Sequence, residues 1–147
     1  MQATPFETVT TIRFRHCDPA GIVFYPRYFE LINDLVETWF ETGVGVSFHE
    51  LHVARRMGIP TVSVQCDFRA VSRWDDRLRQ RLHLTRLGNA SLQAQVEFAG
   101  DAGDVRLCAH IVLVTIDLDT MRSAPLPQDM RAAMQRYLIP SADAACA

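Results

Sequence analysis

Residues Arg15 to Phe40 read RHCDPAGIVFYPRYFELINDLVETWF, and the rest of the chain is interpreted around this stretch. Asp18 opens a turn, Asp-Pro-Ala-Gly, and a short apolar link leads to Pro26. Proline is favoured at the first helical position, so Pro26 marks the expected start of a helix. Gly43 is expected to end it in a left-handed conformation. The residues between them that recur at helical spacing form one apolar stripe, namely Tyr28, Leu31, Ile32, Leu35, Val36 and Trp39.

This order places a carboxylate a few residues before a helix N-terminus. The N–H groups at such a terminus lack partners within the helix and carry a partial positive charge. If the link folds back, Asp18 and those N–H groups can face a reacting carbonyl from two sides. On turn chemistry alone, a second interpretation stays open, in which Asp-Pro only forms a turn and caps the helix.

The run DPAGIVFYPRYF, residues 18–29, closely resembles the signature of the 4-hydroxybenzoyl-CoA thioesterase family of hotdog-fold proteins. That resemblance implies an acyl-CoA thioesterase with Asp18 as its catalytic carboxylate, acting as nucleophile or as general base. It also implies that the backbone N–H at Tyr25 polarises the thioester carbonyl, because Pro26 has no N–H to donate. Gly21 is expected to let the turn bring Asp18 close to that N–H.

The resemblance further implies a homodimer or homotetramer with active sites at the interface between subunits. In such dimers the strand expected at 59–71 lines the pocket of the neighbouring subunit, so Ser63 and Gln65 are candidate substrate-binding residues. A solvated strand face is the other interpretation of these two. Asn33, at the border of the helical stripe, would meet a polar group of the acyl part or face water. Coenzyme A enters as part of the substrate, and no further cofactor is expected.

Periodicity beyond the helix predicts an antiparallel sheet of about five strands wrapped around one central helix, an α+β fold. Short turns between successive strands favour antiparallel pairing. Ser47 and Glu50 form a capping-box pattern that predicts a short second helix, ended by Met57-Gly58. A loop over 121–127 and a short surface helix are predicted after the sheet. The alternating segments are Thr8–Arg15, Ile59–Val71, Arg77–Leu87, Ser91–Ala99 and Val105–Asp117, and the last helix is Gln128–Leu138.

The 147 residues are expected to form a single domain, 1–147, with 139–147 as a frayed tail. A net charge of −2 argues against nucleic-acid binding driven by bulk charge. All 15 basic residues are arginines, so any phosphate-binding cation other than histidine must be an arginine. The candidates around one strand are Arg73, Arg77, Arg79, Arg81 and Arg86, for which a solvated surface is the alternative.

The four cysteines, Cys17, Cys66, Cys108 and Cys146, are scattered without a C-x-x-C pair. Their spacing predicts neither a disulfide framework nor a metal site. No signal peptide and no membrane-spanning run is expected, and together these features favour a cytoplasmic protein. His16 and Cys17 flank Asp18, but neighbouring residues of an extended strand point to opposite faces, so structural roles are expected for both.

These residues are consistent with three functions. The leading hypothesis is a thioesterase for an aromatic acyl-CoA, because the Phe-Tyr-Pro run resembles the hydroxybenzoyl subgroup. The second is a broad short- or medium-chain acyl-CoA thioesterase. The third is a regulator that binds an acyl thioester without hydrolysing it, against which Asp18 weighs, since a pure binder has no need of a carboxylate beside the thioester.

Overall fold

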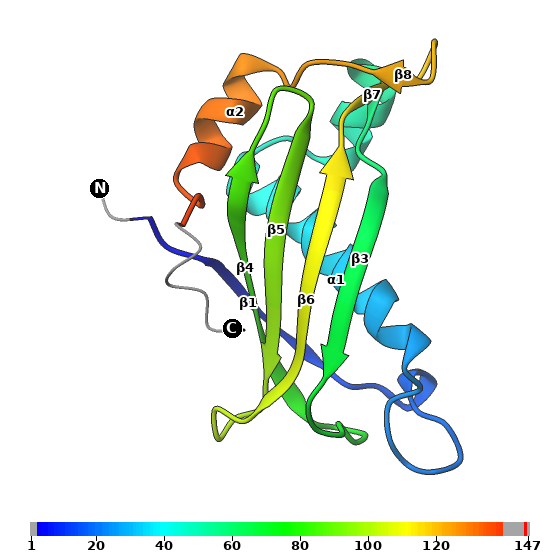
Figure 1. Cartoon of the computed structure of the whole chain (residues 1–147). Coiled ribbons are helices and arrows are strands. Elements are labelled where there is room, and N and C mark those ends of the chain that lie inside the picture. The colour runs from blue at the N-terminus through cyan, green and yellow to red at the C-terminus, as the bar shows by residue number, and fades with distance from the viewer. Residues whose placement is uncertain (1–2, 140–145, 147) are drawn as a thin grey trace.

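The structure, a computed structural model, describes residues 3–139 and 146. An antiparallel five-stranded sheet packs on helix α1, Pro26–Thr38, which crosses behind it in Figure 1. The predicted α+β architecture, about five strands around one long helix, is therefore confirmed. The strands lie across the sheet in the order β1 (Phe6–Thr11), β4 (Arg77–Leu87), β5 (Ser91–Ala99), β6 (Val105–Val114) and β3 (Thr61–Phe68).

The predicted apolar stripe of α1 is the helix side of the core. All six of its residues are buried, and Trp39 is completely inaccessible to solvent. On the sheet side, alternate residues of the central strands complete the core, among them Leu82, Val96 and Leu107. Burial of large apolar side chains contributes about 1.5–3 kcal/mol each, so this helix–sheet contact holds the fold together and fixes where α1 begins.

The end of the central helix differs from the prediction. The chain continues beyond α1 as a π-helical segment, Trp39–Val44, and the left-handed cap is Gly45, with φ of +86°. Gly43 is instead buried inside the last turn. A Cβ at Gly43 would lie 2.7 Å from Trp39 Cδ1 and 2.9 Å from the Tyr137 hydroxyl. Close packing, rather than a left-handed backbone, therefore requires glycine at 43.

This difference yields a first prediction. We expect Gly43→Asn to destabilise the protein by about 1–3 kcal/mol, because the new side chain overpacks the contact with Trp39 and Tyr137. Gly45→Asn is the matched control, since asparagine tolerates a left-handed backbone and nothing lies within 4 Å of its Cβ. Thermal unfolding of both variants measures the difference. Equal midpoints would contradict the assignment of the two glycines.

Two of the predicted strands, β4 and β5, begin and end at the predicted residues, whereas others are shorter. β3 starts two residues later and ends three residues earlier than expected. The strand expected to run to Asp117 is broken after β6 and turns into a small second sheet. That sheet consists of β2 (Met57–Gly58), β7 (Ile116–Asp117) and β8 (Arg122–Ser123), so part of the predicted 121–127 loop is a strand.

The first strand was predicted to start two residues too late and to end four residues too late. β1 ends at Thr11, and Phe14–His16 forms a 3₁₀ turn. Within that turn Phe14 is 75% exposed and packs against the Trp74 ring in an edge-on contact, whereas Ile12 before it is completely buried. Ile12 still exchanges backbone hydrogen bonds with the turn before β4, through the Asp76 carbonyl and the Asp75 N–H, and the chain leaves the sheet after it.

The helices outside the core also differ in detail from the predictions. Ser47 Oγ accepts a hydrogen bond from the Glu50 N–H at 3.1 Å, which confirms half of the capping box. A π-helical segment, Glu50–Ala54, follows, and Met57-Gly58 belongs to β2. The last helix, α2 (Gln128–Gln135), is shorter than predicted, and Met130 and Met134 on one of its faces are completely buried.

The beginning and the end of the described chain meet. The Thr4 N–H donates to the Arg136 carbonyl at 3.3 Å, and Leu84 of β4 exchanges backbone hydrogen bonds with Tyr137 and Ile139. Residue 139 is therefore held on the sheet rather than frayed. Of the remaining expected tail, residues 140–145 and 147 lie outside the described residues.

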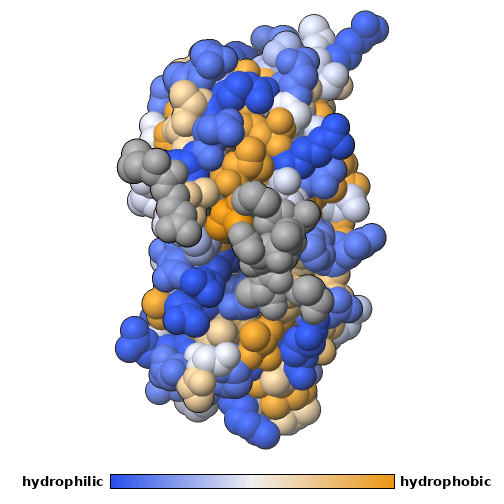
Figure 2. All heavy atoms as spheres, turned by 60° about the vertical axis from the view of Figure 1, so that its left-hand side comes forward, coloured by the Kyte–Doolittle hydropathy of each residue, from blue (hydrophilic) through white to orange (hydrophobic). Residues whose placement is uncertain are grey.

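The two edges of the sheet differ in character. Figure 2, turned to bring the β1 side of Figure 1 forward, has many hydrophilic side chains with smaller apolar areas between them, and there Arg81 forms an ion pair with Glu7. β3 is the opposite edge, and apart from half-buried Cys66 its residues are exposed on both faces. Val62, Val64 and Phe68 are 59%, 43% and 47% exposed. None of the helices in the described ranges is long and apolar enough to cross a membrane.

Two cysteines that the sequence left unpaired are joined. Cys108 of β6 forms a disulfide with Cys146, 38 residues further on. The prediction of no disulfide is therefore wrong for this pair, because a single long-range bridge leaves no spacing pattern in the sequence. Cys17 and Cys66 are free thiols.

Candidate active site

Asp18 lies at the tip of a small hairpin that precedes α1. Cys17 and Val23 pair as antiparallel bridge partners, and the Asp18 carbonyl accepts the Gly21 N–H at 2.9 Å. Gly21 has φ of +79°, which glycine adopts without strain, so the predicted role of Gly21 in forming the turn fits its geometry. The Phe24 N–H closes the hairpin by donating to the His16 carbonyl at 2.9 Å.

The Asp18 carboxylate is half-buried and only partly engaged. Its Oδ1 accepts the Ala20 N–H at 2.9 Å, an Asx turn that holds the side chain over the hairpin tip. Its Oδ2 accepts no hydrogen bond from any residue in the described ranges. One carboxylate oxygen therefore stays available for chemistry while the other keeps the group in place.

The backbone N–H of Tyr25 is free at the start of α1. Tyr25 is the N-cap residue, Pro26 follows it, and no acidic side chain stands in the first turn to offset the positive end of the helix. Within the described part of the chain this N–H donates to no acceptor. A free amide at an uncompensated helix N-terminus is a suitable donor to a developing oxyanion.

A largely apolar groove of about 560 Å³ opens beside this N-terminus. One wall is the hairpin and the start of α1, through Val23, Tyr25 and Tyr28. The other wall is the end of β3 and the loop that follows it, residues 68–72. Asp18 itself does not line the groove, although Ile22 and Val23 of its hairpin do.

Phe68 is the centre of an aromatic cluster in this groove. Its ring lies 5.6 Å from that of Tyr28, 6.0 Å from that of Tyr25 and 6.3 Å from that of Phe29, measured between centroids. Phe68 was not among the predicted site residues. Its signal was the alternation of the strand, which puts Phe68 on the same face as Val64 and Cys66, toward α1.

The substrate-binding residues predicted on β3 lie on its other face. Ser63 pairs with Val112 and Gln65 pairs with His110 on β6, whereas Phe68 pairs with buried Leu107. Ser63 and Gln65 are therefore not brought to the groove of their own chain. Asn33 is exposed on α1 and lines two smaller hollows further along, between α1 and β3.

Arg106 of β6 holds the loop wall of the groove in place. Its Nη1 donates to the Val71 carbonyl at 3.0 Å, to Ser72 Oγ at 3.1 Å and to Asp76 Oδ2 at 2.8 Å. Its Nε donates to Asp104 at 2.5 Å. The Ser72 carbonyl in turn accepts the Val23 N–H at 2.9 Å, so this network reaches the Asp18 hairpin. Arg106 was not among the predicted site residues, because its partners Val71, Ser72 and Asp76 lie 30 to 35 residues away in the sequence.

Charge strengthens this network. Burial acts to raise the pKa of the Asp76 carboxyl, but the Arg106 guanidinium and the Arg73 N–H outweigh it, so the pKa of Asp76 lies below its usual value. The hydrogen bond to Asp76 likewise raises the pKa of Arg106. Burial raises the pKa of the Tyr28 phenol beside them, so the groove wall presents a neutral hydroxyl at physiological pH.

His16 and Cys17 have the local roles expected of them. His16 is buried, its Nδ1 accepts the Arg13 N–H at 2.8 Å, and burial lowers the pKa of its imidazole. The Cys17 thiol lies 3.8 Å from the Arg13 carbonyl, and burial raises its pKa. Both side chains therefore serve the turn before Asp18 in uncharged form.

The chain matches one known protein family over most of its length. The sequence model of the family described as "Thioesterase-like superfamily" matches residues 12–134, which span the hairpin, α1 and the entire sheet except β1. The chain belongs to this superfamily. The prediction of a hotdog-fold thioesterase is thereby confirmed at the level of the superfamily, whereas membership of the hydroxybenzoyl subfamily stays a prediction. No protein of curated function matches the sequence.

Solved structures of this thioesterase-like fold superpose closely. A 1,4-dihydroxy-2-naphthoyl-CoA thioesterase from Synechocystis has a TM-score of 0.82 at 22% identity, over 90% of this chain and 96% of that one. A gentisyl-coenzyme A thioesterase has 0.77 at 25%, over 86% and 99%. A Staphylococcus aureus protein in complex with CoA has 0.85 at 15%, over 93% and 85%. These structures and this superfamily member share one fold along nearly their full length.

Proposed function

We propose that this thioesterase hydrolyses the thioester of an aromatic acyl-CoA, of hydroxybenzoyl type or a close analogue. The observation that carries the proposal is the groove beside the free Tyr25 N–H, with aromatic walls from Tyr25, Tyr28 and Phe68. Aromatic side chains favour stacked and edge-on contacts with an aromatic ring. Two structural neighbours are named as thioesterases of aromatic acyl-CoAs, which supports the same substrate class here.

In the proposed mechanism the carbonyl oxygen of the thioester accepts a hydrogen bond from the Tyr25 N–H. The N-terminus of α1 stabilises the negative charge that develops on this oxygen. Asp18 then attacks the carbonyl carbon, the C–S bond breaks, and CoA leaves as a thiolate. Water hydrolyses the resulting anhydride and regenerates the carboxylate. Alternatively, Asp18 acts as general base and takes a proton from the attacking water. Because the leaving thiolate belongs to a thiol with a pKa of about 8.5, the C–S bond can break without a strong general acid.

We further propose that the site is completed by a second copy of the chain. β3 is an unpaired edge that is exposed on both faces, with apolar side chains such as Val64 and Phe68 on one of them, and pairing between chains is the usual way to cover such an edge. In the homodimer, Asn33, Ser63 and Gln65 would contact substrate held mainly by the partner. Arg69 lines the groove, is exposed and has no ion-pair partner among the described residues, which suits it to a phosphate of CoA.

The test is hydrolysis of benzoyl-, hydroxybenzoyl-, phenylacetyl- and aliphatic acyl-CoAs, followed by release of free thiol. We expect the highest kcat/KM for the aromatic substrates. Phe68→Leu should lower the ratio of aromatic to aliphatic kcat/KM by roughly 2- to 12-fold. This range corresponds to the loss of one aromatic contact of about 0.5–1.5 kcal/mol. Phe14→Leu is the matched control, since Phe14 is exposed outside the groove.

The other outcomes separate the alternatives. A preference for short or medium aliphatic chains would replace the aromatic assignment with the broad thioesterase. Binding of acyl-CoA without thiol release by the folded wild type would support the non-catalytic regulator instead.

A further inference from the structure

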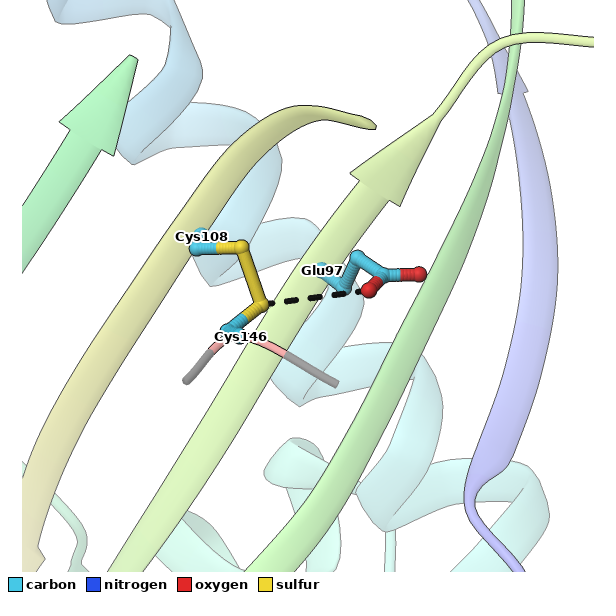
Figure 3. The surroundings of a disulfide bond; sticks show 3 residues. All are labelled: Glu97, Cys108 and Cys146. Carbon is cyan, nitrogen blue, oxygen red and sulfur yellow. Dashed lines mark hydrogen bonds between the residues drawn. A yellow bond between two sulfur atoms is a disulfide. The ribbon is translucent and has the colours of Figure 1, made fainter. Parts of the chain in front are cut away.

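The face of the sheet that points away from α1 carries a cluster unrelated to the groove. Glu97 of β5 and Cys108 of β6 are directly opposite each other in the register, and Cys146 is bonded to Cys108 (Figure 3). All three are buried, with 8%, 4% and 9% of their surfaces exposed. One donor atom from each side chain lies within 4.8 Å of the others.

Glu97 is the acidic side chain of this cluster. It has no ion pair with any described residue, because Arg81, its neighbour on β4, pairs with Glu7. Among the described residues, its side chain contacts one polar atom, Cys146 Sγ, at 3.8 Å from Oε2. A disulfide sulfur carries no proton, so in the oxidised form this contact gives the carboxylate no donor. A buried carboxylate without donors or a cation is unfavourable.

We propose that Glu97, Cys108 and Cys146 bind a thiophilic divalent cation such as Zn²⁺ once the Cys108–Cys146 bond is reduced. Two thiolates and a carboxylate are a ligand set that zinc accepts. Zinc–sulfur and zinc–oxygen bonds of about 2.3 and 2.0–2.2 Å bring such donors within about 4 Å of one another. The observed spacing is close to this, so small side-chain rotations suffice.

Metal binding requires two steps, reduction of the disulfide and loss of the two thiol protons. A dithiol reductant passes two electrons to the disulfide, giving two thiols and the oxidised reductant. Zn²⁺ then displaces both thiol protons, which leave to solvent. Glu97 and Cys108 are held on adjacent central strands, so two of the three ligands are preorganised. A fourth position is left for water or for His110, which lies two residues from Cys108 on the same face of β6.

The two other buried groups on this face fit a polar site. His83 and Gln95 are paired across β4 and β5, one step from Glu97, and both are buried. His83 Nε2 and Gln95 Oε1 find no hydrogen-bond partner among the described residues. Metal-bound water is a natural partner for such groups, since outer hydrogen bonds commonly orient the ligands of a metal.

The test is titration of the full-length protein with Co²⁺, a spectroscopic stand-in for Zn²⁺, after reduction and removal of reductant without oxygen. We expect one Co²⁺ per chain and a sulfur-to-cobalt charge-transfer band, which Zn²⁺ abolishes. Cys108→Ser and Cys146→Ser should each lose the band, and Glu97→Gln should weaken binding by more than about tenfold. Cys66→Ser is the matched control and should behave as wild type.

Absence of the band in reduced wild type would overturn the proposal, as would a band that survives in Cys108→Ser. Circular dichroism of each variant checks folding, and Glu97→Gln, which retains both thiols and the size of the side chain, keeps the test decisive if a serine variant fails to fold. The readout does not involve thioester hydrolysis, so the metal site and the proposed function stand or fall separately.

Discussion

Asp18→Asn is expected to reduce kcat for the best acyl-CoA substrate by about 10³-fold or more. Asparagine is neither a nucleophile nor a base at neutral pH, and the step it replaces contributes about 10²–10⁴-fold even as general-base catalysis alone. The fold should be unaffected, because the asparagine Oδ1 can still accept the Ala20 N–H that Asp18 accepts at 2.9 Å. The measurement is thiol release at saturating substrate for wild type and variant.

Glu37→Gln is the matched control for this variant. Glu37 is exposed on α1, lies outside the groove and has no ion pair within the described ranges, so its kcat should equal that of wild type. Asp18→Asn with more than about a tenth of wild-type activity would remove Asp18 from the mechanism. A covalent acyl group on Asp18, trapped in a single turnover and found by mass spectrometry, would select the nucleophile over the general base.

Arg106→Met is expected to lower kcat/KM by roughly 10- to 100-fold, although Arg106 is not proposed to contact the substrate. The loss follows from misplacement, since the Arg106 hydrogen bonds to Val71, Ser72 and Asp76 hold the loop that lines the groove and supports the Asp18 hairpin. The free energy of unfolding should fall by about 1–3 kcal/mol, because Asp76 loses its partner but remains one-third exposed. Steady-state kinetics and urea unfolding measure the two effects.

The pH dependence of stability distinguishes loss of the Arg106–Asp76 ion pair from nonspecific destabilisation of the variant. The pKa of Asp76 is lowered in the folded state, so its contribution to stability is present above the unfolded pKa of about 3.9 and is lost as the pH falls through the lower folded value. Wild type and Arg106→Met should therefore converge in stability below about pH 4. Arg79→Met, on the exposed face of β4, is the control. A constant difference down to pH 3 would contradict the role of the pair.

The hydrophobic periodicity of the sequence correctly predicted the buried face of the central helix and the limits of two strands. The six stripe residues of α1 and the limits of β4 and β5 follow from patterns of 3.6 and 2 residues, because each element buries one face against the same core. The Asp18 turn and the free Tyr25 N–H followed from proline and glycine chemistry together with the family signature.

The remaining features depend on contacts between segments far apart in the chain. Gly43 and Gly45 look alike in sequence, and only the packing of Trp39 and Tyr137 decides which one caps the helix. β3 has the pattern of a half-buried strand, yet it is an edge and is exposed on both faces. Arg106 and the Cys108–Cys146 bond join segments more than 30 residues apart, for which spacing offers no signal.

The meeting of the chain ends has a consequence for engineering. Because the Thr4 N–H reaches the Arg136 carbonyl, a designed linker that joins residue 139 to residue 4 would need to span only a short gap. New ends could then be opened in the exposed turn between β5 and β6, at residues 101–103, none of which lines the groove. In such a circularly permuted chain the order of strands along the sequence changes, while their neighbours in the sheet, and hence the groove, stay the same.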